Sequence, residues 1–253
     1  MEERIVRLGA LLLLIGSIYA SAAPAAELSV EAVKQALAAA APGKPADLSG
    51  RDLSELDLSG LDLRLANLAR ANLFGAKLVG ANLAGANLAG ANLDAAWLMR
   101  ANFAGANLAN ASLFAPVIYS TVEINPAEAP NFGGADLSGA RIIARLNGVN
   151  LAGAKLVNGR LGVDMKNQPM GQMRNDFSGA NLAGADLSRA ELSRAVFTFA
   201  NLSNAKLAGA KLMDADLSGA DLRGADLTGA DVTGAKFEGA ALEGVKGLAP
   251  GAR

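Results

Sequence analysis

An apolar residue, usually leucine, returns at every fifth position through most of this chain. The period runs from Leu48 to Leu113 and again from Phe177 to Leu242, and Ala usually stands two positions before each apolar centre. In an α-helix, side chains five residues apart drift around the axis and never form one apolar stripe. A flat strand fails as well, because five is odd and successive leucines would face opposite sides of a sheet.

A backbone that turns a corner after each short extended segment satisfies this period. Ala and the apolar centre, two positions apart, then point to one interior, and the residue between them points outward. Glycines such as Gly75, Gly80 and Gly85 fall at the corners, where they tolerate the dihedral angles of a tight turn. We therefore expect the chain to coil around its own leucines.

The tandem motif A-[D/N]-L-x-x, as in VGANLAGANLAGANL at 79–93, resembles the pentapeptide-repeat family. The resemblance covers residues 46–113, 132–161 and 176–242. It implies an all-β fold, a right-handed quadrilateral parallel β-helix with four pentapeptides in each coil. Coils stacked at the usual interstrand spacing lie about 4.8 Å apart.

Four pentapeptides per coil place outward residues in columns. Asn67, Asn87 and Asn107 then lie above one another, where amides form a hydrogen-bonded ladder and stacked carboxylates would repel. In the last block the columns mix signs, as at Glu191 and Lys211. The first coil is acidic, and we interpret its carboxylates as structural: Asp47, Asp52, Asp57 and Asp62.

The N-terminal residues have another character. Residues 1–22 combine a charged start, an apolar segment and small residues before the end, which is the pattern of a signal peptide cleaved near Ala22. We expect a periplasmic or secreted protein with no membrane contact after cleavage; an uncleaved anchor is the alternative. Residues 23–45 predict a capping helix and linker over the open edge of the first coil. In the first coil, which this helix would cover, three residues replace the inward alanines: Arg51, Leu56 and Leu61.

The C-terminal tail, 243–253, predicts no comparable helix. Resemblance to the family implies that the last coil pairs with a second copy as a homodimer. The alternative is that Leu248 and Pro250 fold over this edge.

Two loops interrupt the period, and protruding loops are the expected recognition elements of a regular rod. The first is a proline-rich inserted loop at 114–131, and the second is a Met-rich loop at 162–175. Met165, Met170 and Met173 suit Cu(I), but methionines in a loop more often fill an apolar gap. We therefore predict no bound metal and no cofactor.

Outward apolar side chains gather beside the first loop. The expected columns join Val79, Met99 and Tyr119, with Trp97 and Val117 in the column alongside. This set either docks a protein partner or is covered by the loop, and a patch beside its own loop is usually covered. The candidate protein-binding patch consists of Phe74, Val79, Trp97, Met99, Phe114, Val117 and Tyr119.

The composition limits the function. The sequence has no Cys and no His, which removes disulfides, thiolate nucleophiles and the usual near-neutral base. Glu123, Glu128 and Asp164 stand in loops without a partner base, so we predict no catalytic residue and no enzyme. Some members of the family protect DNA gyrase by imitating duplex DNA. This imitation requires stacked carboxylates and a large negative net charge, whereas the net charge here is −1.

We therefore predict an exported, non-catalytic, rigid protein-binding or scaffolding module that binds an unidentified protein and no nucleic acid. A DNA-mimicking regulator of an enzyme such as gyrase is the alternative if the chain is not exported. Binding of Cu(I) through the Met-rich loop is a further alternative.

Overall fold

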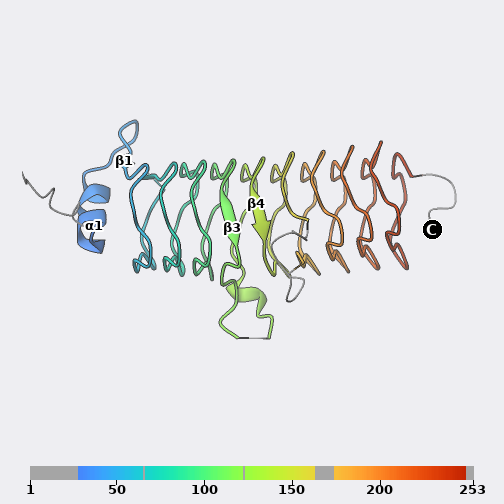
Figure 1. Ribbon diagram of the computed structural model, residues 1–253, viewed down its shortest axis with the longest axis horizontal. Coiled ribbons are helices and arrows are strands. Elements are labelled where there is room, and N and C mark those ends of the chain that lie inside the picture. The colour runs from blue at the N-terminus through green and yellow to red at the C-terminus, as the bar shows by residue number, and fades with distance from the viewer. Residues whose placement is uncertain (1–27, 65, 122, 163–173, 249–253) are drawn as a thin grey trace, which may run out of the picture.

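In the computed structural model, the protein is a long rod of stacked coils (Figure 1). The structure describes residues 28–64, 66–121, 123–162 and 174–248. Helix α1 stands at one end of the rod, and a loop projects from its side. The predicted right-handed quadrilateral β-helix with one short N-terminal helix is confirmed. The predicted signal peptide and Met165, Met170 and Met173 lie outside the described residues.

The regular coils contain 20 residues, as four pentapeptides require. Parallel bridges join Asp52 to Asn72 and Asn72 to Asn92, each pair 20 residues apart. The extended parts are short because the chain turns after two or three residues. β1 pairs with β2 and β3 with β4, all in parallel. The named strands are β1 (Ala46–Asp47), β2 (Ala66–Asn67), β3 (Ser112–Phe114) and β4 (Arg141–Ile143).

A tight turn closes each pentapeptide. In one example, the Leu68 carbonyl accepts a hydrogen bond from the Ala71 amide at 3.0 Å, and Arg70 between them has a φ of 58°. Gly85 occupies the same place in another turn with a φ of 70°. Glycine adopts this left-handed conformation without strain, which explains why it recurs at the corners.

The interior is a continuous column of leucine and alanine. Leu83 and Leu88 have no exposed surface, and burial of each leucine stabilises the rod by roughly 1.5–3 kcal/mol. Larger aromatic side chains also stack from coil to coil. The ring centroids of Phe103 and Phe132 are 4.8 Å apart, and the rings of Phe177 and Phe197 stack in the same way at 4.9 Å.

Helix α1 (Val30–Ala38) covers the first coil, as predicted. The Ser29 hydroxyl accepts a hydrogen bond from the Ala32 amide and caps the helix N-terminus. Val33 is fully buried in the core, whereas Leu56 and Leu61 are half-buried against it. Arg51 remains exposed, so it takes no place beneath the helix. Within the described residues, no helix has the length and apolar character needed to cross a bilayer.

The two interruptions leave the columns in register. Asn102 and Asn131 bond across the first loop although they are 29 residues apart, so that coil contains nine extra residues. The next pair, Asn131 and Asn150, is 19 apart, which is the one-residue slip visible in the sequence. Asn150 and Asn181 are 31 apart, so the second loop adds eleven residues to a coil.

The regular coils extend further than the predicted segment boundaries. Phe114 lies in β3 and Val117 still pairs with Trp97, so the inserted loop begins later than residue 114. At the other end, Lys246 pairs with Asp226. The solenoid therefore continues beyond residue 242.

Candidate functional surface

Two sides of the prism differ in chemistry, although both have the same backbone. The first, here the asparagine face, presents one outward column of Asp62, Asn82, Asn102, Asn131, Asn150, Asn181, Asn201, Asp221 and Ala241. The second, here the Trp97 face, presents Asp57, Lys77, Trp97 and Val117, followed after the loop by Arg145, Asp176, Val196, Asp216 and Lys236.

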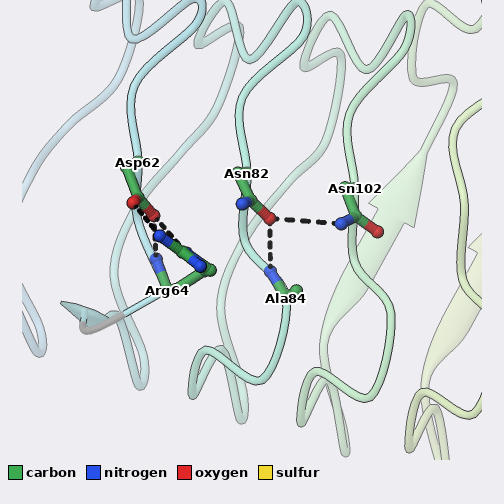
Figure 2. A network of polar contacts seen from close by, with 5 residues as sticks. All are labelled: Asp62, Arg64, Asn82, Ala84 and Asn102. Atoms are coloured by element: carbon green, nitrogen blue, oxygen red, sulfur yellow. Dashed lines mark hydrogen bonds and ion pairs between the residues drawn. The ribbon is translucent and has the colours of Figure 1, made fainter. Parts of the chain in front are cut away.

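On the asparagine face, the amide side chains form two kinds of hydrogen bond. The Asn102 side-chain nitrogen donates to Asn82 Oδ1 at 3.2 Å, and the same oxygen accepts the Ala84 amide of its own turn at 3.3 Å (Figure 2). The side chain thus caps a turn within one coil and joins that coil to the next. Asparagine supplies both a donor and an acceptor, whereas aspartate supplies only the acceptor.

The acidic start of this face is structural. In Figure 2 the Asp62 carboxylate turns toward Arg64, whose Nε donates to Oδ1 at 2.8 Å. This hydrogen bond and the Arg64 charge lower the pKa of Asp62 to about 2. The neighbouring carboxylates Asp47, Asp52 and Asp57 each accept hydrogen bonds from the hydroxyl and the amide of the serine two residues on, which lower the pKa of each.

The structure divides the predicted patch, which extends from the Trp97 face to the neighbouring column of Asn72, Asn92 and Ser112. Trp97 and Phe74 remain 42% and 44% exposed, so they are open to a partner. Met99 and Tyr119 are buried, and their side chains offer no docking surface. The other three members are half-buried: Val79, Phe114 and Val117.

The expectation that Tyr119 continues the Val79–Met99 column is wrong. The Arg100 amide donates to the Glu128 carbonyl at 2.7 Å, so Glu128 takes the place in the column after Met99. Tyr119 instead lies buried with its hydroxyl donating to the Asn147 carbonyl of the next coil. Burial raises the pKa of this phenol. Tyr119 therefore anchors the inserted loop.

Hydrogen bonds between Ser120 and Glu128 join the two ends of the inserted loop. The Glu128 carboxylate accepts the Ser120 amide at 2.7 Å and the Ser120 hydroxyl at 2.8 Å, and these bonds lower the pKa of Glu128. A single turn of 3₁₀-helix, η1 (Pro126–Glu128), completes the closure. Ile124 projects from the loop with 43% of its surface exposed. The loop thus adds a further exposed apolar side chain.

Asn175 is a structural residue that the period alone does not reveal. It occupies an inward position normally held by alanine and is 1% exposed. Its amide nitrogen donates to the Ile142 carbonyl at 2.8 Å, and its oxygen accepts the Ala144 amide at 2.8 Å. These bonds satisfy the backbone where the one-residue slip shortens the previous coil. An Asn in place of the inward Ala is the sequence signal.

Two cations lie over aromatic rings at this surface. Lys77 Nζ is 6.0 Å from the Trp97 ring centroid and 3.9 Å from Asp57 Oδ2. The Arg141 guanidinium lies 4.8 Å from the Phe114 ring centroid. Such contacts stabilise a partly exposed ring by roughly 0.5–1 kcal/mol and hold its orientation.

A hollow of about 740 Å³ lies between α1 and the flank of the first coils. Lys34 and Leu37 of the helix face Leu61, Asp62 and Arg64 of the rod across it. Asp62 and Arg64 bind each other, so neither provides a free catalytic group. Across the described parts of the chain, no group of three or more acidic side chains is placed to hold a metal ion.

The repeats match the pentapeptide-repeat family pattern in eight copies. The matches cover residues 46–78, 66–103, 76–113, 176–212 and 210–246, which together exceed half of the chain. The chain belongs to the pentapeptide-repeat family, whose members are generally non-catalytic.

Solved structures of the same family are similar to this chain. HetL, involved in heterocyst differentiation regulation in the cyanobacterium Nostoc sp., is 28% identical over 86% of this chain and 96% of its own, with a TM-score of 0.33. A thylakoid-lumen protein of Arabidopsis thaliana is 27% identical over 58% of this chain and 68% of its own, with a TM-score of 0.19. QnrB1, a plasmid-mediated fluoroquinolone resistance protein, is 18% identical over 77% and 88%, with a TM-score of 0.26. No curated protein matches the chain.

Proposed function

We propose that this protein is a rigid, non-catalytic module that binds a protein partner through the exposed part of the Trp97 face and the inserted loop. The observation that carries this proposal is the exposure of Trp97, Phe74 and Ile124, three of the five large apolar side chains exposed among the described residues; the other two, Phe199 and Met213, lie in later coils. Exposed aromatic side chains on a rigid scaffold are typical anchors of protein interfaces.

We place this module outside the cytoplasm. The support is the sequence of residues 1–22, in which a charged start, an apolar segment and small residues follow the order of a signal peptide. Sequencing the N-terminus of protein isolated from the periplasm tests this location. A mature chain that begins near Ala23 supports export; an intact chain in the cytoplasm contradicts it.

The alternative, a DNA-mimicking regulator, has less support. Duplex DNA presents one negative charge at every step, whereas the column Asp186, Lys206, Asp226 and Lys246 alternates in sign. The outward column of the asparagine face is mostly neutral. A mimic would need carboxylates in these positions.

Photo-crosslinking tests the binding face directly. A benzophenone amino acid at Trp97 is expected to capture a partner in periplasmic extract, while the same group at Ala104 captures none. Ala104 is the matched control because it points outward on the asparagine face and its amide, not its side chain, bonds Asn102. Equal capture at both positions, or capture at neither, contradicts the proposal.

We propose in addition that the last coil pairs with a second copy. Val232, Leu242 and Val245 are only half-buried there, whereas α1 covers the equivalent residues at the other end of the rod. Among the described residues up to Leu248, no helix covers this edge. Sedimentation of the wild type against Leu242→Glu tests it, with a dimer that becomes a monomer as the expected result and unchanged mass as the contrary one.

A further inference from the structure

One rung of the rod stacks two like charges. Arg141 and Arg160 pair as parallel neighbours in adjacent coils, whereas the nearby charged columns alternate, as Asp136 and Lys155 do. Like charges directly opposite each other on neighbouring strands are destabilising. The Arg141–Arg160 pair therefore does not stabilise the stacking of its two coils, and its presence suggests a role other than stability.

The residues around this rung leave its charge uncompensated. Glu191, the next residue in the column, has its carboxylate 2.7 Å from Lys211 Nζ. Asp94 Oδ1 accepts both the Ser112 hydroxyl and the Phe114 amide, and among the described residues no ion pair joins Asp94 to either arginine. Among the described residues, neither Arg141 nor Arg160 forms an ion pair, and Arg160 is exposed.

The rung adjoins Phe114, a member of the candidate patch. The Arg141 guanidinium lies over the Phe114 ring, and Phe114 shares a column with the exposed Phe74 two coils away, with Asp94 between them. A guanidinium on an aromatic ring keeps its donors directed outward in a fixed plane. Such a fork suits a carboxylate, which it binds through two parallel hydrogen bonds.

We propose that the Arg141–Arg160 rung, with Phe74 and Phe114, binds an acidic protein segment that carries an apolar side chain. Carboxylates of the segment bond the two guanidinium groups, and the apolar side chain packs on the phenylalanine rings. This inference rests on the proposed function and names the chemistry of its partner. Two cations one coil apart neutralise few phosphates, so a nucleic acid, whose affinity grows with each phosphate bound, fits this surface less well.

A pair of charge-matched variants tests the proposal. The probes are a fluorescent peptide of about 12 residues that alternates Glu-Glu-Phe, its Lys-Lys-Phe counterpart and a single-stranded oligonucleotide of equal length. The acidic peptide is expected to bind the wild type, and R141Q/R160Q is expected to weaken it about tenfold, since two charge-assisted bidentate bonds are lost. K206Q/K246Q removes the same charge from an alternating column and should change affinity less than about twofold.

Three results overturn the proposal: equal loss in both variants, tighter binding of the oligonucleotide, or no binding of the acidic peptide. Thermal melting separates binding from folding. R141Q/R160Q removes both the like-charge repulsion and the Arg141–Phe114 contact, which are small and opposite in sign, so its melting temperature should stay close to that of the wild type. A clear decrease shows that the arginines serve the fold and also overturns the proposal. If Trp97 crosslinks a partner while the acidic peptide fails, the proposed function stands and only this inference falls.

Discussion

The asparagine face and the Trp97 face have the same backbone conformation and differ in their outward side chains. Along the first, Asn82, Asn102 and Asn131 repeat one pair of hydrogen bonds, so each coil specifies the position of the next. Along the second, Trp97 and Arg145 belong to a column in which charged, aromatic and aliphatic residues follow one another. The comparison teaches that stacking requires a regular outward column on only part of the prism, which leaves another side free to vary for recognition.

Removing one asparagine should have the largest effect on stability. Asn131 donates to Asn102, accepts from Asn150 at 2.7 Å and caps its own turn, so Asn131→Ala leaves several groups unpaired. We expect a loss of about 1–3 kcal/mol in the free energy of unfolding. Trp97→Ala, on the other face, removes the contact with Lys77 and should cost no more than about 1 kcal/mol.

Urea unfolding followed by circular dichroism measures both variants. Asn131→Ser is a useful intermediate, since its hydroxyl retains a short donor and acceptor. If Trp97→Ala destabilises the rod as much as Asn131→Ala, the two faces contribute equally to stacking and the comparison fails.

A smaller effect is expected where the inserted loop joins the Trp97 face. Tyr119→Phe keeps the buried ring and removes only the hydroxyl that donates to the Asn147 carbonyl. The expected cost is about 1 kcal/mol, with faster amide hydrogen exchange in residues 119–130 and little change elsewhere. Exchange that stays unchanged in this segment would show that the bond does not hold the loop.

Substitutions at turn residues on the two faces should change the stability by a similar or smaller amount. Gly85, below the asparagine face, has a φ of 70°, and no atom lies within 4 Å of an added Cβ. Gly85→Ala should therefore cost only the backbone strain, about 1 kcal/mol. Ala95, at the corner before Trp97, has a φ of 58°, so Ala95→Gly should stabilise the rod by about 0.5–1 kcal/mol. Melting temperatures that move in the same direction for both variants would contradict this account of the turns.

Low pH should destabilise turns capped by aspartate but not turns capped by asparagine. The loss of stability at any one residue is expected to be the smallest of these effects. The pKa values of Asp226 and Asp231 are lowered by hydrogen bonds from Thr228 and Thr233. A lowered folded pKa means that this stabilisation is present above the unfolded value, near 3.9, and is lost as the pH falls through the folded value. The melting temperature should therefore decrease between about pH 5 and pH 2.

The double variant D226N/D231N keeps both caps without a titratable group. It should lose less of its melting temperature over the same pH range than the wild type. An equal loss in the two proteins would show that these turns do not contribute to the acid sensitivity.

Much of the fold can be predicted from the period alone. The five-residue recurrence predicts the coil, the 20-residue columns and the amide ladder at Asn67 and Asn87, which bond at 2.9 Å. The capping helix and the structural role of Asp52 also follow from local sequence. These features are predictable because each depends on residues at a fixed separation.

The parts that escape prediction all lie where the period breaks. Tyr119 leaves its column because the chain departs after Ile118 and Glu128 takes the vacated place, a choice made by tertiary packing. Asn175 acts on Ile142 and Ala144 across a coil, through contacts that no regular spacing predicts. The exposed part of the patch could therefore be identified only once the path of the inserted loop was known.

Because identical steps separate the coils, the rod measures distance as well as providing a surface. Trp97 and Val117 are one step apart along the axis, about 4.8 Å, and every further coil adds the same increment. Insertion or deletion of a complete coil would move the groups on either side of it nearer or farther without altering the chemistry of any one of them. Evolution of such a protein can therefore adjust the spacing between two contact points separately from their affinity.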